Sequence, residues 1–206
     1  MRFQFFYAII FNRFLIIFLL VIQIPSRKLV TKLTREEGLR KVLKSYEAYY
    51  DVEECEVTAE FPLVATCSFY VHSEKYVLVK KAKLWSADSN EYVYIFSVPV
   101  FNKTIYEKCR DYAYEKGMAL IDPKPGHMYT YITTLFVCDQ SEKDAVRALK
   151  RCRLHKNFQF SLLGWMDFHT ALIDLATNKV YTNGSGHENA KFLKSIIHVK
   201  NKKREV

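Results

Sequence analysis

The spacing of apolar residues after position 33 follows the period of an α-helix. Leu39, Val42, Leu43 and Tyr46 share one face, and charged residues occupy most positions between them. Residues 34–37 have the Thr-x-x-Glu pattern of a capping box, in which two side chains satisfy free amides of the first turn. Together these patterns predict an amphipathic helix over residues 36–49.

Three further helices are predicted from caps and from the same spacing. Asn102 is a suitable N-cap for a helix that runs to Lys116 and ends at Gly117. Another helix begins at residues 141–144, and the last follows a second capping box at residues 185–188.

Strands are indicated where β-branched and aromatic residues gather. The segments are 55–71, 76–85, 91–98, 128–138, 165–175 and 179–182, with Pro62 interrupting the first. The turn-forming residues 86–90 predict a hairpin between the second and third segments. Residues 177–178 predict another hairpin near the C-terminus.

The predicted order is α-β-β-β-α-β-α-β-β-α, which is typical of an α+β fold. Because hairpins join several strands, we expect one sheet, mainly antiparallel, with helices packed on it. No Gly- or Ser-rich linker divides residues 30–199, so they are predicted to form a single domain. Residues 1–29 are a separate hydrophobic segment, and residues 200–206 are a basic tail.

Residues 3–24 are almost wholly apolar and allow two interpretations. The stretch approaches the length of a membrane span, about 20 residues, although Arg13 lies at its centre. As an anchor it leaves the domain in the cytoplasm, because more basic residues follow it than precede it. Alternatively, translation starts at Val30 and residues 1–29 are an untranslated leader, which also makes the domain cytoplasmic.

Charge distinguishes the ends of the chain from its body. The 31 Lys and Arg residues exceed the 22 Asp and Glu residues by +9. Residues 1–29 carry +4 and residues 200–206 carry +3, so the body carries only +2. Basic tails are usually solvated; otherwise they contact anionic lipid or nucleic acid.

The five cysteines form no C-x-x-C pair. Their odd number predicts free, buried thiols, with Cys138 at a strand end as the accessible one. Cysteines and histidines lack the close spacing of zinc ligands, and no phosphate-binding glycine motif is present. We therefore predict no metal site and no cofactor.

Acids and histidines gather around the predicted C-terminal hairpin. Asp167 and His169 are two residues apart on one strand and therefore share a face, while His187 precedes the last helix. With Asp174, they are the candidate acid–base or metal cluster of a hydrolase. The alternative is that they are exposed surface residues, with His187 in a cap.

The first six predicted elements, α-β-β-β-α-β, have the order of restriction-endonuclease-like folds. Such enzymes need an acid on one strand and an acid-x-Lys pair on the next to hold Mg²⁺. Asp88 and Glu91 supply acids, but Val93 stands where the lysine belongs. This departure argues against nuclease chemistry.

Two surfaces are candidates for binding without catalysis. The helix that begins near residue 141 is predicted to carry a basic face, which is either solvated or grips phosphate. Its basic residues are Arg147, Lys150, Arg151 and Arg153. Aromatic residues also crowd the predicted strands, and Tyr92 and Tyr94 share a face. They are either core residues under helices or a stacking platform for a planar ligand.

Several segments resemble a family of uncharacterised bacterial proteins, a domain of unknown function. The resemblance rests on EKYVLVKKAKLW at 74–85, SNEYV at 89–93, HMYTY at 127–131 and LGW at 163–165. It covers about residues 33–198 and implies a bacterial cytoplasmic domain, with no activity attached.

These observations favour a non-enzymatic cytoplasmic binding or interaction module. Its partner is unknown: another protein, or a membrane contacted through the N-terminal segment. A metal-dependent hydrolase or nuclease-like enzyme using Asp167, His169 and His187 is the alternative. Nucleic-acid binding by the basic helix and tails is a second alternative.

Overall fold

The computed structural model describes residues 33–56, 61–76 and 83–197, which all belong to one compact unit. The helices of this part are α2 (Arg35–Tyr46), α3 (Lys103–Ala119), α4 (Lys143–Arg151) and α5 (Asn189–Ile197). The strands are β1 (Asp51–Glu54), β2 (Leu63–Tyr76), β3 (Lys83–Phe101), β4 (His127–Ser141), β5 (His155–Asn157), β6 (Trp165–Asp174) and β7 (Lys179–Thr182).

The strands form one mixed sheet in the order β1-β2-β3-β4-β6-β5, and β7 also pairs with β6. β3, β4 and β6 are parallel to one another, and the outer strands are antiparallel to their neighbours. The prediction of a single α+β domain is confirmed. The sheet is mixed rather than mainly antiparallel, because α3 and α4 are crossovers that return the chain in the same direction.

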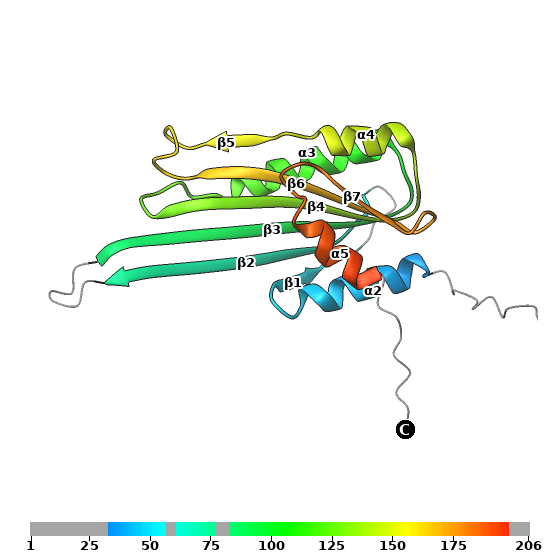
Figure 1. Ribbon diagram of the computed structural model, residues 1–206, viewed down its shortest axis with the longest axis horizontal. Helices are drawn as coiled ribbons and strands as arrows, with labels where there is room; N and C mark the ends of the chain where they lie inside the picture. The colour runs from blue at the N-terminus through cyan, green and yellow to red at the C-terminus, as the bar shows by residue number, and fades with distance from the viewer. Residues whose placement is uncertain (1–32, 57–60, 77–82, 198–206) are drawn as a thin grey trace, which may run out of the picture. The chain divides into compact units, whose positions relative to one another are not determined.

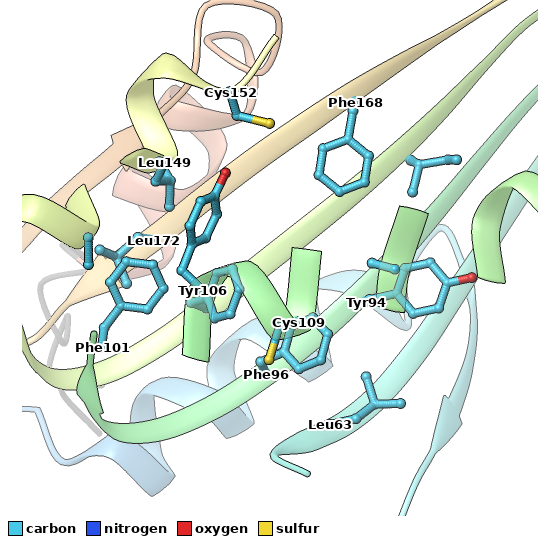
Figure 2. Close-up of a cluster of buried hydrophobic side chains, with 14 of the residues drawn as sticks. Leu63, Tyr94, Phe96, Phe101, Tyr106, Cys109, Leu149, Cys152, Phe168 and Leu172 are labelled. Atoms are coloured by element: carbon cyan, nitrogen blue, oxygen red, sulfur yellow. The ribbon is translucent and has the colours of Figure 1, made fainter. Parts of the chain in front are cut away.

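Helices pack on both faces of the sheet. α3 and α4 cover one face, where Figure 2 shows Phe96, Phe101 and Tyr106 within a single apolar cluster. α2 and α5 cover the other face, over Val93 and Leu135 among others. In Figure 1, α2 and α5 cross only one end of the strands. The α2/α5 face of β3, β4 and β6 is therefore free of these helices at its other end.

Strand alternation decides which residues occupy that free region. Successive side chains point to opposite faces. Even-numbered residues in the centres of β3, β4 and β6 belong to the cluster under α3 and α4, and odd-numbered residues belong to the cluster under α2 and α5. Odd-numbered residues near the beginnings of these strands therefore lie on the α2/α5 face beyond the helices.

The predicted hairpin at residues 86–90 was wrong. These residues lie inside β3, where Ser86 pairs with Glu74 and Asn90 pairs with Tyr70. β4 pairs with β3 along its other edge from Asp88 onward. Pairing with two neighbours outweighs the local preference of Ser, Asp and Asn for turns. β2 and β3 are joined by residues 77–82, which lie outside the described residues.

The helix caps were predicted with mixed success. The Thr34 capping box is confirmed, and Asn102 Oδ1 accepts from the Ile105 amide at 2.8 Å. The predicted capping box at residues 185–188 was wrong: Ser185 Oγ donates to the Phe168 carbonyl, and α5 begins at Asn189. The predicted helix end at Gly117 was also wrong, because α3 continues to Ala119.

Among the residues that the structure describes, no helix is both long and apolar enough to cross a membrane. The predicted anchor at residues 3–24, the alternative start at Val30 and the basic tail lie outside them.

Candidate functional site: an aromatic row on the sheet

Four rings form a continuous row where the α2/α5 face is free of these helices. The ring centres of Trp165 and Tyr129 are 5.8 Å apart, and those of Tyr129 and Tyr131 are 4.7 Å apart. The row ends at His169, whose ring centre is 4.5 Å from that of Tyr131. The three larger side chains are half-buried, so parts of their surfaces remain open to a ligand. We call these four residues the aromatic row.

Acidic residues flank the middle of the aromatic row. In the sheet register, Tyr131 pairs with Glu91 on β3 and with Asp167 on β6. These three side chains share the α2/α5 face because paired residues point the same way. Burial raises the pKa of the Tyr131 hydroxyl, and the negative charges of Asp167, Glu188 and Glu91 raise it further. Three acidic side chains therefore act on the middle of the row.

Glu91 is held by two hydroxyl groups. Its carboxylate accepts hydrogen bonds from Tyr50 at 2.7 Å and from Thr133 at 3.2 Å. Burial raises the pKa of Glu91, although both hydrogen bonds act in the opposite direction. Tyr50 also lies against Phe69, with ring centres 5.3 Å apart. These contacts fix the acid beside the row.

Asp167 is paired with a histidine from the edge strand. His155 Nδ1 lies 2.8 Å from Asp167 Oδ1, and His155 Nε2 lies 3.0 Å from Asn157 Oδ1. The hydrogen bond to Asp167 raises the pKa of His155. Asp167 therefore has a fixed partner at the β5 edge, while its charge still acts on Tyr131.

His169 is buried beside these groups. Only 8% of the residue is exposed, and its Nδ1 atom has no hydrogen-bond partner in the described part of the chain. Burial lowers the pKa of His169, against the opposing charges of Asp167 and Glu188. A buried ring nitrogen without a partner is costly, so this atom is a candidate for contact with a ligand.

Asn183 fixes the segment that carries His187 against β6. Its Nδ2 donates to the carbonyls of Cys152 and Phe168, and its Oδ1 accepts from the amides of Thr170 and Gly186. A Cβ at Gly186 would lie 3.2 Å from His169 Cβ, so this segment is in close contact with the row.

The structure brings together the predicted trio of Asp167, His169 and His187. Both Asp167 and His187 act electrostatically on His169. His187 itself is exposed, with Nδ1 3.1 Å from the Gly184 carbonyl oxygen. Asp174 lies apart from the trio on the opposite face, where its carboxylate accepts from Ser141 Oγ at 2.6 Å.

The other predicted binding residues lie elsewhere. Tyr92 and Tyr94 face α3: Tyr94 is 4% exposed within the core, and the Tyr92 hydroxyl donates to the Leu120 carbonyl at 3.5 Å. The basic residues of α4 and the turn after it lie at the surface, and Lys150 Nζ lies 4.8 Å from the Tyr181 ring centre. These basic residues are Arg147, Lys150, Arg151 and Arg153.

The acids considered for nuclease chemistry do not converge. Asp88 is hydrogen-bonded to His72, whose contact lowers the pKa of Asp88. Glu91 lies three residues further along β3 and faces the aromatic row. No group of three or more His, Cys, Asp and Glu residues suited to a metal ion occurs in the described part of the chain.

The cysteines are free, as predicted. Cys138 was expected to be accessible, but it is fully buried, and burial raises the pKa of its thiol to about 12. Cys55 is the partly exposed thiol instead. The strand does not end at Cys138 but continues to Ser141, which places Cys138 inside the core.

Sequence reasoning missed the parts that Trp165, Glu91 and His155 play in this site. Tyr129, Tyr131 and Trp165 are odd-numbered residues of predicted strands, so alternation indicates a shared face once β4 and β6 are known to be neighbours. The parallel pairing that makes them neighbours has no local sequence signal.

Comparison with known proteins gives a family and no activity. A protein family described as a domain of unknown function, DUF8052, matches residues 34–195. No curated protein and no solved structure matches the chain. Since the match covers most of its length, the chain belongs to the DUF8052 family.

Proposed function

We propose that this domain is a non-enzymatic binding module that holds a planar cation, the guanidinium group of an arginine in a partner protein. The observation that carries the proposal is the half-exposed aromatic row with acids on either side. A guanidinium group stacks on aromatic faces and pairs with carboxylates, so it uses both features of this surface.

The charges near the row favour this ligand over nucleic acid. Glu91 and Asp167 flank Tyr131, and the charge of Glu188 also acts on it. A phosphate backbone would be repelled at this position, although aromatic rings alone would suit bases. The whole chain has a net charge of +9, which opposes unspecific attraction of cationic peptides. Binding of such a peptide therefore depends on the local acids.

The test uses fluorescence of Trp165 in a Trp85→Phe background, which leaves a single tryptophan. Short Gly-Arg-Gly peptides are compared with Gly-Lys-Gly and with Gly-citrulline-Gly at matched ionic strength. Citrulline is planar but neutral, and lysine is charged but not planar. We expect the arginine peptide to quench Trp165 and to bind about tenfold more tightly than either analogue.

Matched variants identify the charge that matters. Asp167→Asn should weaken binding about fivefold, since it removes one nearby charge. Asp122→Asn should leave binding unchanged, because Asp122 is an exposed acid that pairs with Lys124 in the loop before β4. Equal affinity for the citrulline peptide, or equal effects of the two variants, contradicts the proposal.

One observation favours a second candidate, an acid–base hydrolase. His169 has a buried Nδ1 atom without a partner, and its ring feels the charges of Asp167 and His187, the other two catalytic candidates. Turnover of nitrophenyl phosphates or esters is measured for the wild type and for His169→Gln, with and without divalent metal ions. Activity lost in His169→Gln supports this candidate; no turnover by the wild type supports the binding module.

We also propose that the domain works in the cytoplasm. Its five cysteines are free, which fits a reducing compartment. The mass of the N-terminus in separate membrane and soluble fractions of the native host tests this location. The same measurement distinguishes an anchor at residues 3–24 from a start at Val30.

A further inference from the structure

The β5–β6 loop, residues 158–164, presents two apolar side chains to solvent. Phe160 is 98% exposed and Leu162 is 79% exposed. Phe158 is buried at the base of the loop, with its ring centre 5.8 Å from that of His127. Phe158 therefore anchors the loop, whereas Phe160 and Leu162 project from it into solvent.

Hydrogen bonds hold this loop in its outward conformation. The Phe158 amide donates to the Gly164 carbonyl at 3.0 Å, and the Leu163 amide donates to the Phe158 carbonyl at 3.2 Å. Gln159, Phe160 and Ser161 have φ angles of 46°, 55° and 69°, in the left-handed region that non-glycine residues rarely adopt. An unfavourable backbone that exposes a phenylalanine indicates a function for the exposed side chain.

The chain next to this loop is strongly basic. Residues 145–166 contain five Lys and Arg residues and no Asp or Glu. Arg151, Arg153 and Lys156 are exposed, and Lys156 belongs to the edge strand β5. Figure 1 shows α4, β5 and the loop following one another along one edge of the sheet. The exposed apolar residues and the basic residues therefore lie along the same edge.

We propose that this edge docks on an anionic lipid surface. Phe160 and Leu162 enter the boundary between headgroups and acyl chains, while Arg153 and Lys156 contact the headgroups. Lipid explains both parts of the edge, because nucleic acid would use the charges but leave Leu162 without an apolar environment. This docking uses neither the aromatic row nor its ligand.

The test places a reporter on the loop of the full chain. Phe160→Trp is made in a Trp85→Phe/Trp165→Phe background and mixed with vesicles of phosphatidylcholine, alone or with phosphatidylserine. The control is Tyr49→Trp in the same background, because Tyr49 is an exposed aromatic residue outside this edge. Residues 3–24 are present in every variant, so any binding that they contribute is common to all.

We expect the emission of the Phe160→Trp reporter to shift to the blue and to be quenched by brominated lipid, more strongly with phosphatidylserine. The control at position 49 should respond to neither. Arg153→Gln combined with Lys156→Gln should lower the partition coefficient about fivefold for each residue. Phe160→Ser should lower co-sedimentation of the chain that keeps its natural tryptophans.

Three outcomes would overturn the proposal. The first is vesicle binding with unchanged emission from the Phe160→Trp reporter, which means that another part of the chain binds lipid. The second is an equal response with and without phosphatidylserine. The third is a larger effect of the double glutamine variant on binding of single-stranded RNA than on vesicle binding.

Discussion

Glu91 is a residue whose burial conflicts with its charge. Because its pKa is raised in the folded state, its contribution to stability is present below the ordinary value of 4.5 and is lost as the pH rises through the folded value. Glu91→Gln removes this loss of stability, because the glutamine side chain does not ionise. Its amide can still form hydrogen bonds with Tyr50 and Thr133. We expect the melting temperature of Glu91→Gln to exceed that of the wild type at pH 7.5, with a smaller difference at pH 4.

Tyr50→Phe provides the matched control for this prediction. It removes a hydrogen bond to the Glu91 carboxylate, so the ionised acid becomes less stable in the fold. We expect Tyr50→Phe to lower the melting temperature, and more so at pH 7.5 than at pH 4. A difference in melting temperature between wild type and Glu91→Gln that is the same at pH 4 and pH 7.5 would contradict the interpretation.

Asn183 is the residue that positions the segment beside His169. Asn183→Ala removes four hydrogen bonds and leaves their buried backbone partners unpaired. We therefore expect a loss of about 3 kcal/mol in the free energy of unfolding. Ser185→Ala removes the hydrogen bond that Ser185 donates to the Phe168 carbonyl and the one it accepts from Asn183 Nδ2, and it should cost only about 1 kcal/mol. Urea denaturation measures both, and equal losses would show that Asn183 has no special role.

α3 lies close to β4 at Gly117. A Cβ at Gly117 would lie 2.7 Å from Ile132 Cδ1, so the helix packs closer than a side chain allows. Gly117→Ala should therefore destabilise the protein by about 1–3 kcal/mol, although alanine favours helices. In an Ile132→Ala background the same substitution should instead stabilise by up to about 1 kcal/mol.

Gly38 in α2 provides the control for the Gly117→Ala substitution. A Cβ there would lie 3.4 Å from Leu33 Cδ2, which is an ordinary contact. Gly38→Ala should therefore be neutral or stabilise the protein by up to about 1 kcal/mol. Destabilisation by Gly117→Ala that persists in the Ile132→Ala background would mean that the contact with Ile132 is not its cause.

Two helix starts were predicted correctly from local signals. The capping box at Thr34 and the cap at Asn102 act within three residues, and both are confirmed. The helix end predicted at Gly117 and the hairpin predicted at residues 86–90 were wrong, because contacts with distant parts of the chain decide the structure there. Gly117 contacts Ile132 on another element, and residues 86–90 are paired with β2 and β4.

Pairing between distant strands also decides which residues meet at the aromatic row. Asp167 and His169 were placed on one face because they are two residues apart on a strand. Tyr131 lies beside these two residues only because β4 pairs with β6 in parallel. Two crossover helices create the parallel centre of the sheet, and no periodicity in the sequence distinguishes them from helices that follow hairpins.

Charge is divided unevenly over the whole chain. Of the net charge of +9, residues 33–199 carry +1, so most of the basicity lies in the ends. Because the described core lies within residues 33–197, we expect the fragment 33–199 to fold with the melting temperature and circular dichroism of the full chain. It should leave a heparin column at much lower salt than the full chain. Elution of both at the same salt would instead locate the anion-binding charge in residues 145–166, where basic side chains border Phe160 and Leu162.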